Sequence, residues 1–382
     1  MRVAILYAGS ISRVSGTSER VLQIANGLAD QGIRVTLSGA IGHHAKALNL
    51  TNLRVIAMPN RILKLPSVFM WVTKLVASGL THRYDVVQIE SFPLARTLAL
   101  FLLLRPFSRK FIIVFHDKWF KDDPRRSIIG RLQLFLQRIL LTLFDTSITP
   151  GLSVKKWFEE LHGELVHKKM VVIPNGVSNL DIKENIDYLH LREKYGLDPN
   201  AFVALFFGSM TFKPNYEAAL RLYEVSNYIS SKFEKISGRN LIFIIAGVGS
   251  KTLPRTQCFI PLGFVEKLDE LLSLPDAIVL PHTPSYSGPH VKTIYAFLSR
   301  KPVIATEDAV KDMPNVTPKK HFLPFDIDEP DTLLKALTDL YLNRELKKHL
   351  ALNAYLYSKK FSWKYISSLH LKLYKKMLQK HI

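Results

Sequence analysis

The sequence predicts an α/β protein with two doubly wound domains, each a parallel sheet covered by helices on both faces. The chain has 382 residues, more than one ordinary hydrophobic core accommodates and enough for two. Short β-branched runs alternate with longer helical patterns from the first residue, and the alternation restarts after the middle of the chain. Near-continuous apolar strands between helices are typical of a parallel sheet buried on both sides.

The first predicted domain alternates strands with helices that carry one apolar face. Residues 18–32 are predicted to form a helix, because apolar side chains recur at a spacing of three and four residues and a glycine ends the run. The strands predicted around this helix are residues 3–9, 33–40, 85–91, 111–117 and 146–151. This domain is expected to cover residues 1–178.

The second predicted domain repeats the design. MVVIPNGV at residues 170–177 precedes a polar stretch, and the border is expected within residues 175–200. The later predicted strands are residues 201–210, 240–250, 277–283 and 302–306. The domain is expected to cover residues 179–355, followed by a final helix in residues 356–382. Ligands of doubly wound folds bind at the carboxyl ends of the strands, so the two domains are expected to face a central cleft.

The composition is that of a globular protein with an unusual excess of positive charge. Hydrophobic residues make up 47% of the chain and charged residues 22%, but the net charge is +20. The cations gather in residues 105–138 and 341–382, among long aliphatic side chains. Such a mixture favours a lipid surface over nucleic acid, which would need aromatic and polar side chains among the cations. A solvated basic surface without a partner remains the alternative.

The sequence predicts a cytoplasmic protein attached to the inner face of a membrane. The apolar run Leu98–Leu104 is shorter than the roughly 20 residues that span a bilayer, and Met1-Arg2 leads directly into a strand rather than a signal peptide. The single Cys258 excludes an intramolecular disulfide and suits a reducing compartment. An anionic membrane surface is therefore an expected partner.

Two segments combine apolar and basic side chains in a way that fits either a core or a membrane surface. In residues 125–144, apolar side chains recur at helical spacing, and a core helix is slightly favoured over a lipid-facing one. These side chains are Ile128, Leu132, Phe135, Ile139 and Leu143. Residues 60–75 have the same mixture, with Trp71 as a candidate anchor at a membrane interface.

Three glycine-containing turns are candidates for phosphate binding. SGTSER at residues 15–20 and GSMTFKPN at residues 208–215 each follow a strand and lead into a helix, whose N-terminal N–H groups favour anions. Residues 287–292 place Gly288, His290 and Lys292 at another predicted helix start. Each turn also fits a plain strand-to-helix connection, in which glycine serves the backbone geometry alone.

His116 is the candidate for acid–base or oxyanion chemistry. It ends the predicted strand 111–117, where a histidine either contacts a substrate or caps the core. Asp117 and Glu90 are possible acids at the same edge. The sequence has no C-x-x-C spacing, and no metal is expected. It has no G-x-S-x-G or Walker motif, which argues against a hydrolase or NTPase.

Together the motifs resemble the GT-B fold nucleotide-sugar glycosyltransferases, in particular the retaining family four type. No single motif carries the resemblance, but their occurrence together and in order is fairly specific. The segments that carry it are SGTSERVLQIANGLADQGIRVTL, FHD at 115–117, IPNGV at 173–177, FFGSMTFKPN at 206–215, IIAGVGS at 244–250, LGFVEKLDELLSLPDAIVLP at 262–281, KTIYAFLSRKPVIAT at 292–306 and FSWKYI at 361–366.

The resemblance implies a UDP- or GDP-sugar donor held mainly by the C-terminal domain, an acceptor met by the N-terminal domain, and no metal cofactor. It also implies that the last helix crosses back onto the N-terminal domain. His116 and Lys292 are the implied catalytic residues. The implied donor-binding residues are Gly16, Gly208, Ser209, Lys213, Gly249, Gly288, His290 and Tyr295.

The sequence departs from the family pattern at positions that matter for donor binding. Ser287 and Tyr295 stand where the family often has two glutamates with seven residues between them, and the second glutamate normally holds the ribose hydroxyls. A tyrosine hydroxyl cannot grip two hydroxyls as a carboxylate does. Ser209 and Arg300 replace an arginine and a glycine of the family. These changes predict an altered or weakened grip on the donor.

The function expected from the sequence is transfer of a hexose from an NDP-sugar to a hydroxyl of a glycan or lipid-linked acceptor, with retention. The leading alternative is a non-catalytic GT-B protein that acts as a partner or scaffold of another transferase, which Tyr295 and Ser287 favour. A nucleic-acid binder is supported by charge alone, without a recognised module. A sugar phosphorylase or an epimerase on the same fold also remains open.

Overall fold

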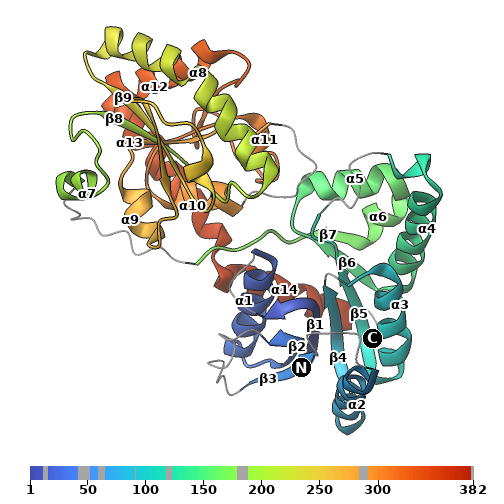
Figure 1. The fold of residues 1–382 in the computed structure, drawn as a ribbon. Coiled ribbons are helices and arrows are strands. Elements are labelled where there is room, and N and C mark those ends of the chain that lie inside the picture. The colour runs from blue at the N-terminus through green and yellow to red at the C-terminus, as the bar shows by residue number, and fades with distance from the viewer. Residues whose placement is uncertain are drawn as a thin grey trace. The chain divides into compact units, whose positions relative to one another are not determined.

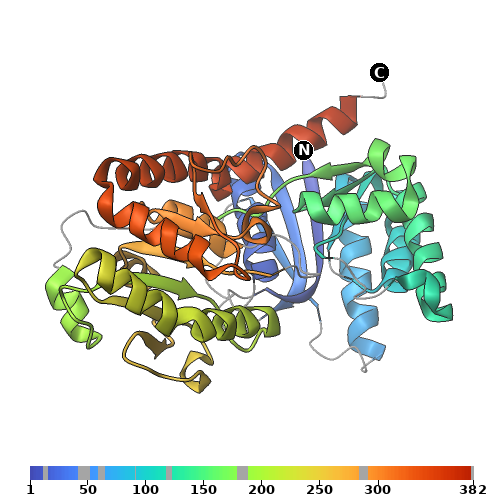
Figure 2. The same cartoon turned by 90° about the horizontal axis from the view of Figure 1, so that it is seen from above.

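The computed structural model describes residues 1–11, 16–41, 52–58, 65–90, 92–117, 123–178, 188–283 and 291–379. They fall into two compact units, drawn in Figures 1 and 2. The first unit holds Met1–Gly176 and Trp363–Ile382, and the second holds Val177–Ser285 and His290–Ser362.

The first unit is a seven-stranded, fully parallel sheet of order β3-β2-β1-β4-β5-β6-β7. The strands are β1 Arg2–Ile11, β2 Arg34–Ile41, β3 Leu53–Met58, β4 Tyr84–Glu90, β5 Ser108–Val114, β6 Thr146–Thr149 and β7 Met170–Val172. The helices are α1 Gly16–Asp30, α2 Leu65–Thr81, α3 Leu94–Leu104, α4 Ile128–Leu143, α5 Leu152–His162, α6 Glu164–Lys169 and α14 Trp363–Gln379.

Two separate cores cover the faces of this sheet, because successive side chains of a strand point to opposite sides. Along β1, Val3 and Ile5 join a core with α1 and α14, whereas Ala4 and Leu6 join one with α2, α3, α4 and α5. Strands buried on both faces need apolar residues at every position, which explains the continuous run in β1.

The second unit is a six-stranded parallel sheet of order β10-β9-β8-β11-β12-β13 around one core. Its strands are β8 Phe202–Phe207, β9 Leu241–Ala246, β10 Phe259–Gly263, β11 Ala277–Leu280, β12 Val303–Ala305 and β13 Leu323–Pro324. Its helices are α7 Tyr188–Lys194, α8 Lys213–Ser237, α9 Leu268–Ser273, α10 Val291–Leu298, α11 Glu307–Val310, α12 Pro330–Leu342 and α13 Arg344–Ser358.

These two doubly wound parallel sheets confirm the predicted fold class. Every strand predicted from the sequence is present, although the boundaries differ by a few residues. Four strands were not predicted, and each lies at an edge of its sheet: β3, β7, β10 and β13.

The helix α14 is fastened to the first unit by close contacts with α1 and with the IPNGV segment. At Gly176, an added Cβ would lie 2.4 Å from Cε3 of the Trp363 ring, so only glycine leaves room for the indole. The fully buried Arg20 of α1 donates to Ile173 O at 3.1 Å and Pro174 O at 2.8 Å. IPNGV and FSWKYI are thus, in part, structural motifs that fix α14 on this unit.

Residues 125–144 contain a helix that packs on the core, as predicted, but the predicted apolar face is not its buried face. On α4, Ile128 is 80% exposed, Leu132 57% and Phe135 60%. The buried face instead carries Gly130, Gln137, Leu140 and Leu141. This face turns inward because Gln137 Oε1 lies 3.0 Å from Nε2 of the buried His162, and because Gly130 fits closely against Pro124.

The proposed membrane anchor Trp71 is also wrong. Its side chain is buried in the first unit, where Nε1 donates to Ser38 Oγ at 2.7 Å and the ring stacks on Phe92 at 6.5 Å between centroids. A buried indole whose N–H is satisfied has no free polar end for a membrane interface. In the described part of the chain, no helix combines the length and apolarity that crossing a membrane requires.

Candidate functional site

In the second unit, two glycines let the loops after β8 and β9 meet backbone to backbone. Gly247 has φ 133°, and a Cβ there would lie 1.9 Å from Gly208 O. Gly208 has φ 150°, and a Cβ there would lie 2.8 Å from Lys292 Nζ. A side chain at Gly208 would displace the ammonium group, and one at Gly247 would push the two loops apart. Glycine at both positions therefore keeps the charge next to the backbone.

Lys292, in the first turn of α10, is a partly buried cation among neutral groups. Its Nζ donates to Asn215 Oδ1 and lies 5.2 Å from the centroid of the Phe206 ring. Asn215 is itself fixed, since its Nδ2 donates to Ser209 O at 2.8 Å. Burial lowers the pKa of Lys292 to about 7. An amide holds the ammonium group without neutralising it, so an incoming anion would supply the missing counter-charge.

The remaining predicted donor-site residues of this unit occupy different surroundings. Ser209 is exposed, and its Oγ shares a 2.7 Å hydrogen bond with Thr211 Oγ1. Lys213 begins α8, is 76% exposed and lies 3.4 Å from Glu217. Gly249, with φ 81°, precedes a short 3-10 turn after β9.

Tyr295, the substitution for a family glutamate, makes a backbone contact. Its hydroxyl accepts a hydrogen bond from the Ser178 N–H at 3.4 Å, and its ring packs against the core of the second unit. Gly288, His290 and Ser287 lie outside the described residues.

A cavity of about 890 Å³ opens at the carboxyl ends of β11, β12 and β13. Thr283, Thr306 and Phe325 line it, each a few residues beyond the end of its strand. Glu307, in the first turn of α11, adds an exposed carboxylate. Its volume is in the range of small-molecule sites, and its position is where doubly wound sheets bind ligands.

In the first unit, Glu90 and His116 meet where β4 and β5 end side by side. Glu90 pairs with Val114 in the sheet, and its Oε2 lies 3.1 Å from Nε2 of His116, two residues beyond β5. The Glu90 side chain is fully buried and that of His116 is 12% exposed. Burial opposes the charge on Glu90, but His116 and then Arg20 outweigh it and hold the pKa of the carboxyl below its usual value.

A buried hydrogen-bond network continues from Glu90 to α14. Gln88 Nε2 donates to Glu90 Oε1, and Tyr374 OH donates to Gln88 Oε1 at 2.7 Å. His370 lies 3.5 Å from Arg20 Nη2, and burial together with Arg20 lowers the pKa of His370 to about 3. His370 is therefore neutral, and the network fixes the orientation of Glu90, which in turn orients His116.

Gly16 begins α1, and a Cβ at this position would meet no atom within 4 Å. Among the described residues, a side chain at this first position of α1 would therefore find room. Asp117, the other candidate acid, is exposed one residue beyond His116. The part of the chain that the structure describes contains no group of three His, Cys, Asp or Glu side chains suited to a metal ion.

Sequence reasoning missed Arg20, His370 and Asn215. Arg20 lies four residues before Ile24 on the apolar face of its helix, and an arginine on such a face signals a buried, paired cation. His370 lies on the apolar face of α14 in the same way. Asn215 sits in the first turn of α8, but nothing in the sequence indicated that its side chain would reach Lys292.

Comparisons with known proteins agree with this architecture. Residues 14–179 match the family Glycosyltransferase Family 4. A comparison with curated protein sequences gives no match.

Solved structures are similar over nearly the whole chain. A glycosyltransferase from Rickettsia africae ESF-5 is 19% identical, with a TM-score of 0.74 and coverage of 99% of both chains. HepE of Anabaena in complex with UDP is 17% identical, with a TM-score of 0.70 and coverage of 98% of this chain and 100% of that one. Sucrose-phosphate synthase from Thermosynechococcus elongatus is 14% identical, with a TM-score of 0.69 and coverage of 99% and 100%.

Two parallel Rossmann-like sheets with this similarity define the GT-B fold that these glycosyltransferase structures share. Within that fold, residues 14–179 match the glycosyltransferase family 4 type, which agrees with the resemblance that the sequence motifs indicated.

Proposed function

We propose that the protein transfers a hexose from a UDP- or GDP-sugar to a hydroxyl of a glycan or lipid-linked acceptor, with retention and without a metal. The observation that carries the proposal is the cluster of Lys292, Asn215 and Gly208 at the carboxyl edge of the second sheet. It offers a cation held by an amide next to close-packed backbone, which suits a diphosphate.

In this reaction Lys292 stabilises the negative charge that develops on the leaving nucleoside diphosphate. A preorganised cation in partly dry surroundings is worth more to such a transition state than the same charge in water. With retention, the departing phosphate oxygen takes the proton of the acceptor hydroxyl. His116, oriented by Glu90 at 3.1 Å, contacts the transferring sugar. Support for a uridine donor comes from HepE, whose structures contain UDP, UDP and glucose, or UDP-glucose.

The test is calorimetric titration of the purified chain with UDP, GDP, UDP-glucose and GDP-mannose, once with EDTA and once with Mg²⁺. We expect selective binding of one nucleotide, equal in both buffers, and at least roughly tenfold weaker binding in Lys292→Met. Lys335→Met is the matched control, because Lys335 is 76% exposed and pairs only with Asp339 on its own helix. Equal affinity in all three proteins would remove Lys292 from the site, and binding that disappears in EDTA would refute metal independence.

For the acceptor side, we infer that the exposed apolar face of α4 rests on an anionic membrane. Ile128, Ile129 and Phe135 are 60% or more exposed, and the neighbouring α3 exposes Leu102 at 62%. The exposed arginines around this face are Arg125, Arg126, Arg131 and Arg138. Burial is the main cause that lowers the pKa of His162 to about 4, and Arg138 and Arg125 add to the shift. The contribution of these arginines indicates positive potential at this surface. Apolar side chains rimmed by arginines fit acyl chains below anionic headgroups, which supports the proposal of a lipid-linked acceptor.

The second candidate function is that of a non-catalytic GT-B partner of another transferase. The hydroxyl of Tyr295 accepts from the Ser178 backbone at 3.4 Å, where the family pattern has a ribose-binding carboxylate. If no nucleotide binds to a well-folded sample, this second function replaces the first.

A further inference from the structure

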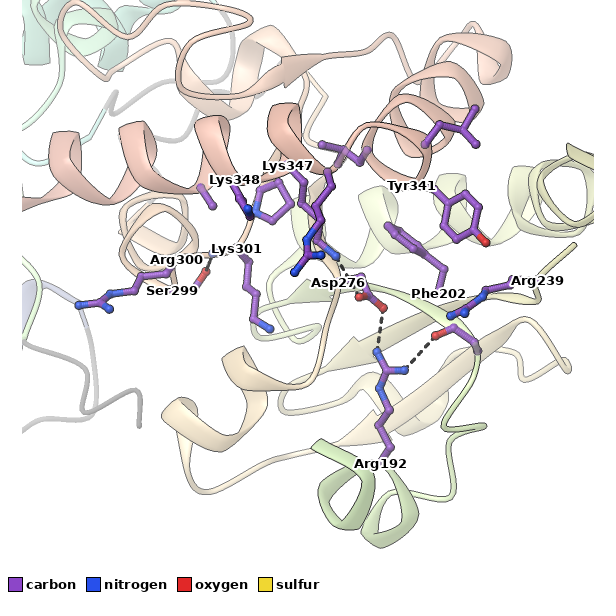
Figure 3. Close-up of a pocket in the computed structure, with 16 residues that line it drawn as sticks. Arg192, Phe202, Arg239, Asp276, Ser299, Arg300, Lys301, Tyr341, Lys347 and Lys348 are labelled. Atoms are coloured by element: carbon purple, nitrogen blue, oxygen red, sulfur yellow. Dashed lines mark hydrogen bonds and ion pairs between the residues drawn. The ribbon is translucent and has the colours of Figure 1, made fainter. Parts of the chain in front are cut away.

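A basic cavity of about 860 Å³ lies at the amino edge of the second sheet, opposite the edge that carries Gly208 and Lys292. Phe202 begins β8, Asp276 immediately precedes β11, and Pro302 immediately precedes β12. Figure 3 shows the 16 residues that line it. Seven of these are Lys or Arg, against Asp276 as the single carboxylate of the lining.

Asp276 binds two cations of the cluster, and both of its carboxylate oxygens accept hydrogen bonds. Its Oδ2 accepts from Arg192 Nη2 at 2.7 Å, and its Oδ1 accepts from Lys347 Nζ at 3.1 Å (Figure 3). Oδ2 also accepts from Val203 N at 3.1 Å. Burial opposes its charge, but Lys347, the Val203 N–H and Arg192 keep the pKa of this carboxyl below its usual value. The pair of cations around Asp276 ties α7 and α13 to the sheet, which is a structural role.

The other cations of the lining are not needed for that role. Lys301 Nζ donates to the Ser273 carbonyl at 2.9 Å. Burial lowers the pKa of Lys301 to about 8, Asp276 opposes the shift, and Lys347 and Arg192 add to it. Arg300 does not contribute, because it points away from Asp276 in Figure 3 and lies 4.4 Å from the centroid of the Tyr355 ring.

The first turns of α13 add two cations at a helix N-terminus. Arg344 is exposed and makes no hydrogen bond or ion pair with the described residues. Lys348 pairs with Glu345 at 3.1 Å, but both side chains are 60% or more exposed, so the pair contributes little. Arg239, from the connection before β9, lies 5.9 Å from the centroid of the Tyr341 ring on the opposite wall. Cations thus converge on the cavity from several elements.

We propose that this cavity binds the phosphate groups of a small phosphorylated ligand, at a site separate from the carboxyl edge of the same sheet. Lys301, Arg344 and Lys348 hold the phosphate oxygens, and the aromatic wall of Phe202 and Tyr341 accommodates the rest of the ligand. A concave site of this volume suits a nucleotide or sugar phosphate better than an extended polyanion. The inference does not depend on the donor site.

The test uses pyrophosphate as the probe and locates it by hydrogen–deuterium exchange of the full chain. We expect protection of peptides that cover residues 299–302 and 340–349. The double variant Arg344→Gln/Lys348→Gln should lose this protection, with the pyrophosphate Kd at this site raised roughly tenfold or more. Both side chains are exposed, so the variant is expected to keep its fold, which is checked by an unchanged Tm.

The matched control is Lys232→Gln/Lys235→Gln on α8, which removes two exposed cations from the same unit. If this control loses protection as strongly, the binding is diffuse surface attraction and the proposal is overturned. Absence of protection at residues 299–302 and 340–349 in the unmodified chain, with pyrophosphate and with vesicles, overturns it as well.

A second arm distinguishes a free phosphate from a lipid headgroup. Sedimentation with phosphatidylglycerol vesicles is compared between the unmodified chain and Arg344→Gln/Lys348→Gln. Protection by pyrophosphate with unchanged sedimentation assigns the site to a soluble ligand. Reduced sedimentation of the variant, without protection by pyrophosphate, assigns the same phosphate chemistry to a lipid headgroup.

Discussion

Lys292 shows how a single neutral partner changes the behaviour of a charge. Asn215 fixes the ammonium group by a hydrogen bond but leaves its charge uncompensated, and burial lowers its pKa to about 7. A carboxylate in place of Asn215 would hold the lysine equally well and would repel a diphosphate. The amide therefore keeps the site both ordered and receptive to an anion.

This arrangement predicts a pH dependence of nucleotide binding. Below pH 7, Lys292 of the free protein already carries its proton. Above pH 7, Lys292 must take up a proton when the diphosphate binds, because the bound diphosphate raises the pKa of the lysine. Affinity for the nucleoside diphosphate should thus fall by up to about tenfold per pH unit above pH 7. Calorimetric titration at several pH values between pH 7 and 9 measures this change in affinity. The slope should vanish in Lys292→Met, and a slope that persists there would assign the titration to another group.

Glu90 allows a prediction about stability at the same scale. The pKa of Glu90 is lower in the folded than in the unfolded protein. Its carboxylate therefore stabilises the fold at pH values above the unfolded pKa, and this stabilisation is lost as the pH falls through the folded pKa. Glu90→Gln removes this charge beside the buried Arg20 and should lower the free energy of unfolding by about 3 kcal/mol at pH 7, and by less in acid. Urea denaturation at pH 7 and pH 4 tests both.

The control for Glu90 is Glu164→Gln, since Glu164 is 86% exposed and pairs with Lys168 on its own helix. Its free energy of unfolding should change by less than about 0.5 kcal/mol at either pH. An equally small effect of Glu90→Gln would show that the buried network adds no net stability.

At the scale of elements, the sequence predicts central strands well and edge strands poorly. Central strands are buried on both faces and show an uninterrupted apolar run, as in Phe202–Phe207. β10 contains Pro261 and β13 ends in Pro324, and proline within a short run argues against a strand unless the strand lies at an edge. The missed strands thus belong to the positions where the sequence signal is weakest.

The sequence predicted only those residues of the candidate site that lie in recognisable local motifs. Gly208 and Lys292 lie in motifs of glycine turns and helix starts, and the structure brings them together. Asn215 and Arg20 act through contacts over 77 and more than 150 positions of the chain, which no local pattern records. For α4, periodicity identified the apolar face but not its environment, because an apolar stripe fits a core and a membrane equally well.

The exposed face of α4 predicts separable effects on membrane binding and stability. Leu132→Gln/Phe135→Gln replaces side chains that are 57% and 60% exposed, so the free energy of unfolding should change by less than about 1 kcal/mol. Binding to vesicles that contain phosphatidylglycerol should drop at least roughly tenfold, since most of the apolar contact with the acyl region is lost. Vesicle sedimentation and urea denaturation measure the two quantities.

For comparison, Leu352→Gln/Leu356→Gln changes residues that are 57% and 56% exposed on α13 of the second unit. It should leave vesicle binding unchanged. Equal loss in both variants would mean that α4 is not the membrane-facing element.

The whole molecule depends on the return of its last helix to the first unit. Gly176→Ala would drive a methyl group into the Trp363 ring, 2.4 Å from Cε3, and overpacking of this kind costs about 1–3 kcal/mol. We expect a lower Tm, measured by calorimetry. Gly16→Ala serves as the control, because a Cβ there meets nothing within 4 Å and the Tm should hold or rise slightly. An unchanged Tm in Gly176→Ala would show that the indole shifts without loss.

The fastening of α14 also sets an order of events during synthesis. His370 lies 350 positions from Arg20, and Tyr374 lies 286 positions from Gln88, yet both pairs are buried together. At about 5–20 residues per second, a ribosome needs roughly 20 seconds or more to reach them. Until then, the part of α1 that packs on α14 has no cover, although the strands beside α1 are complete. The unit that is translated first can therefore finish folding only after the second unit and α14 have been made.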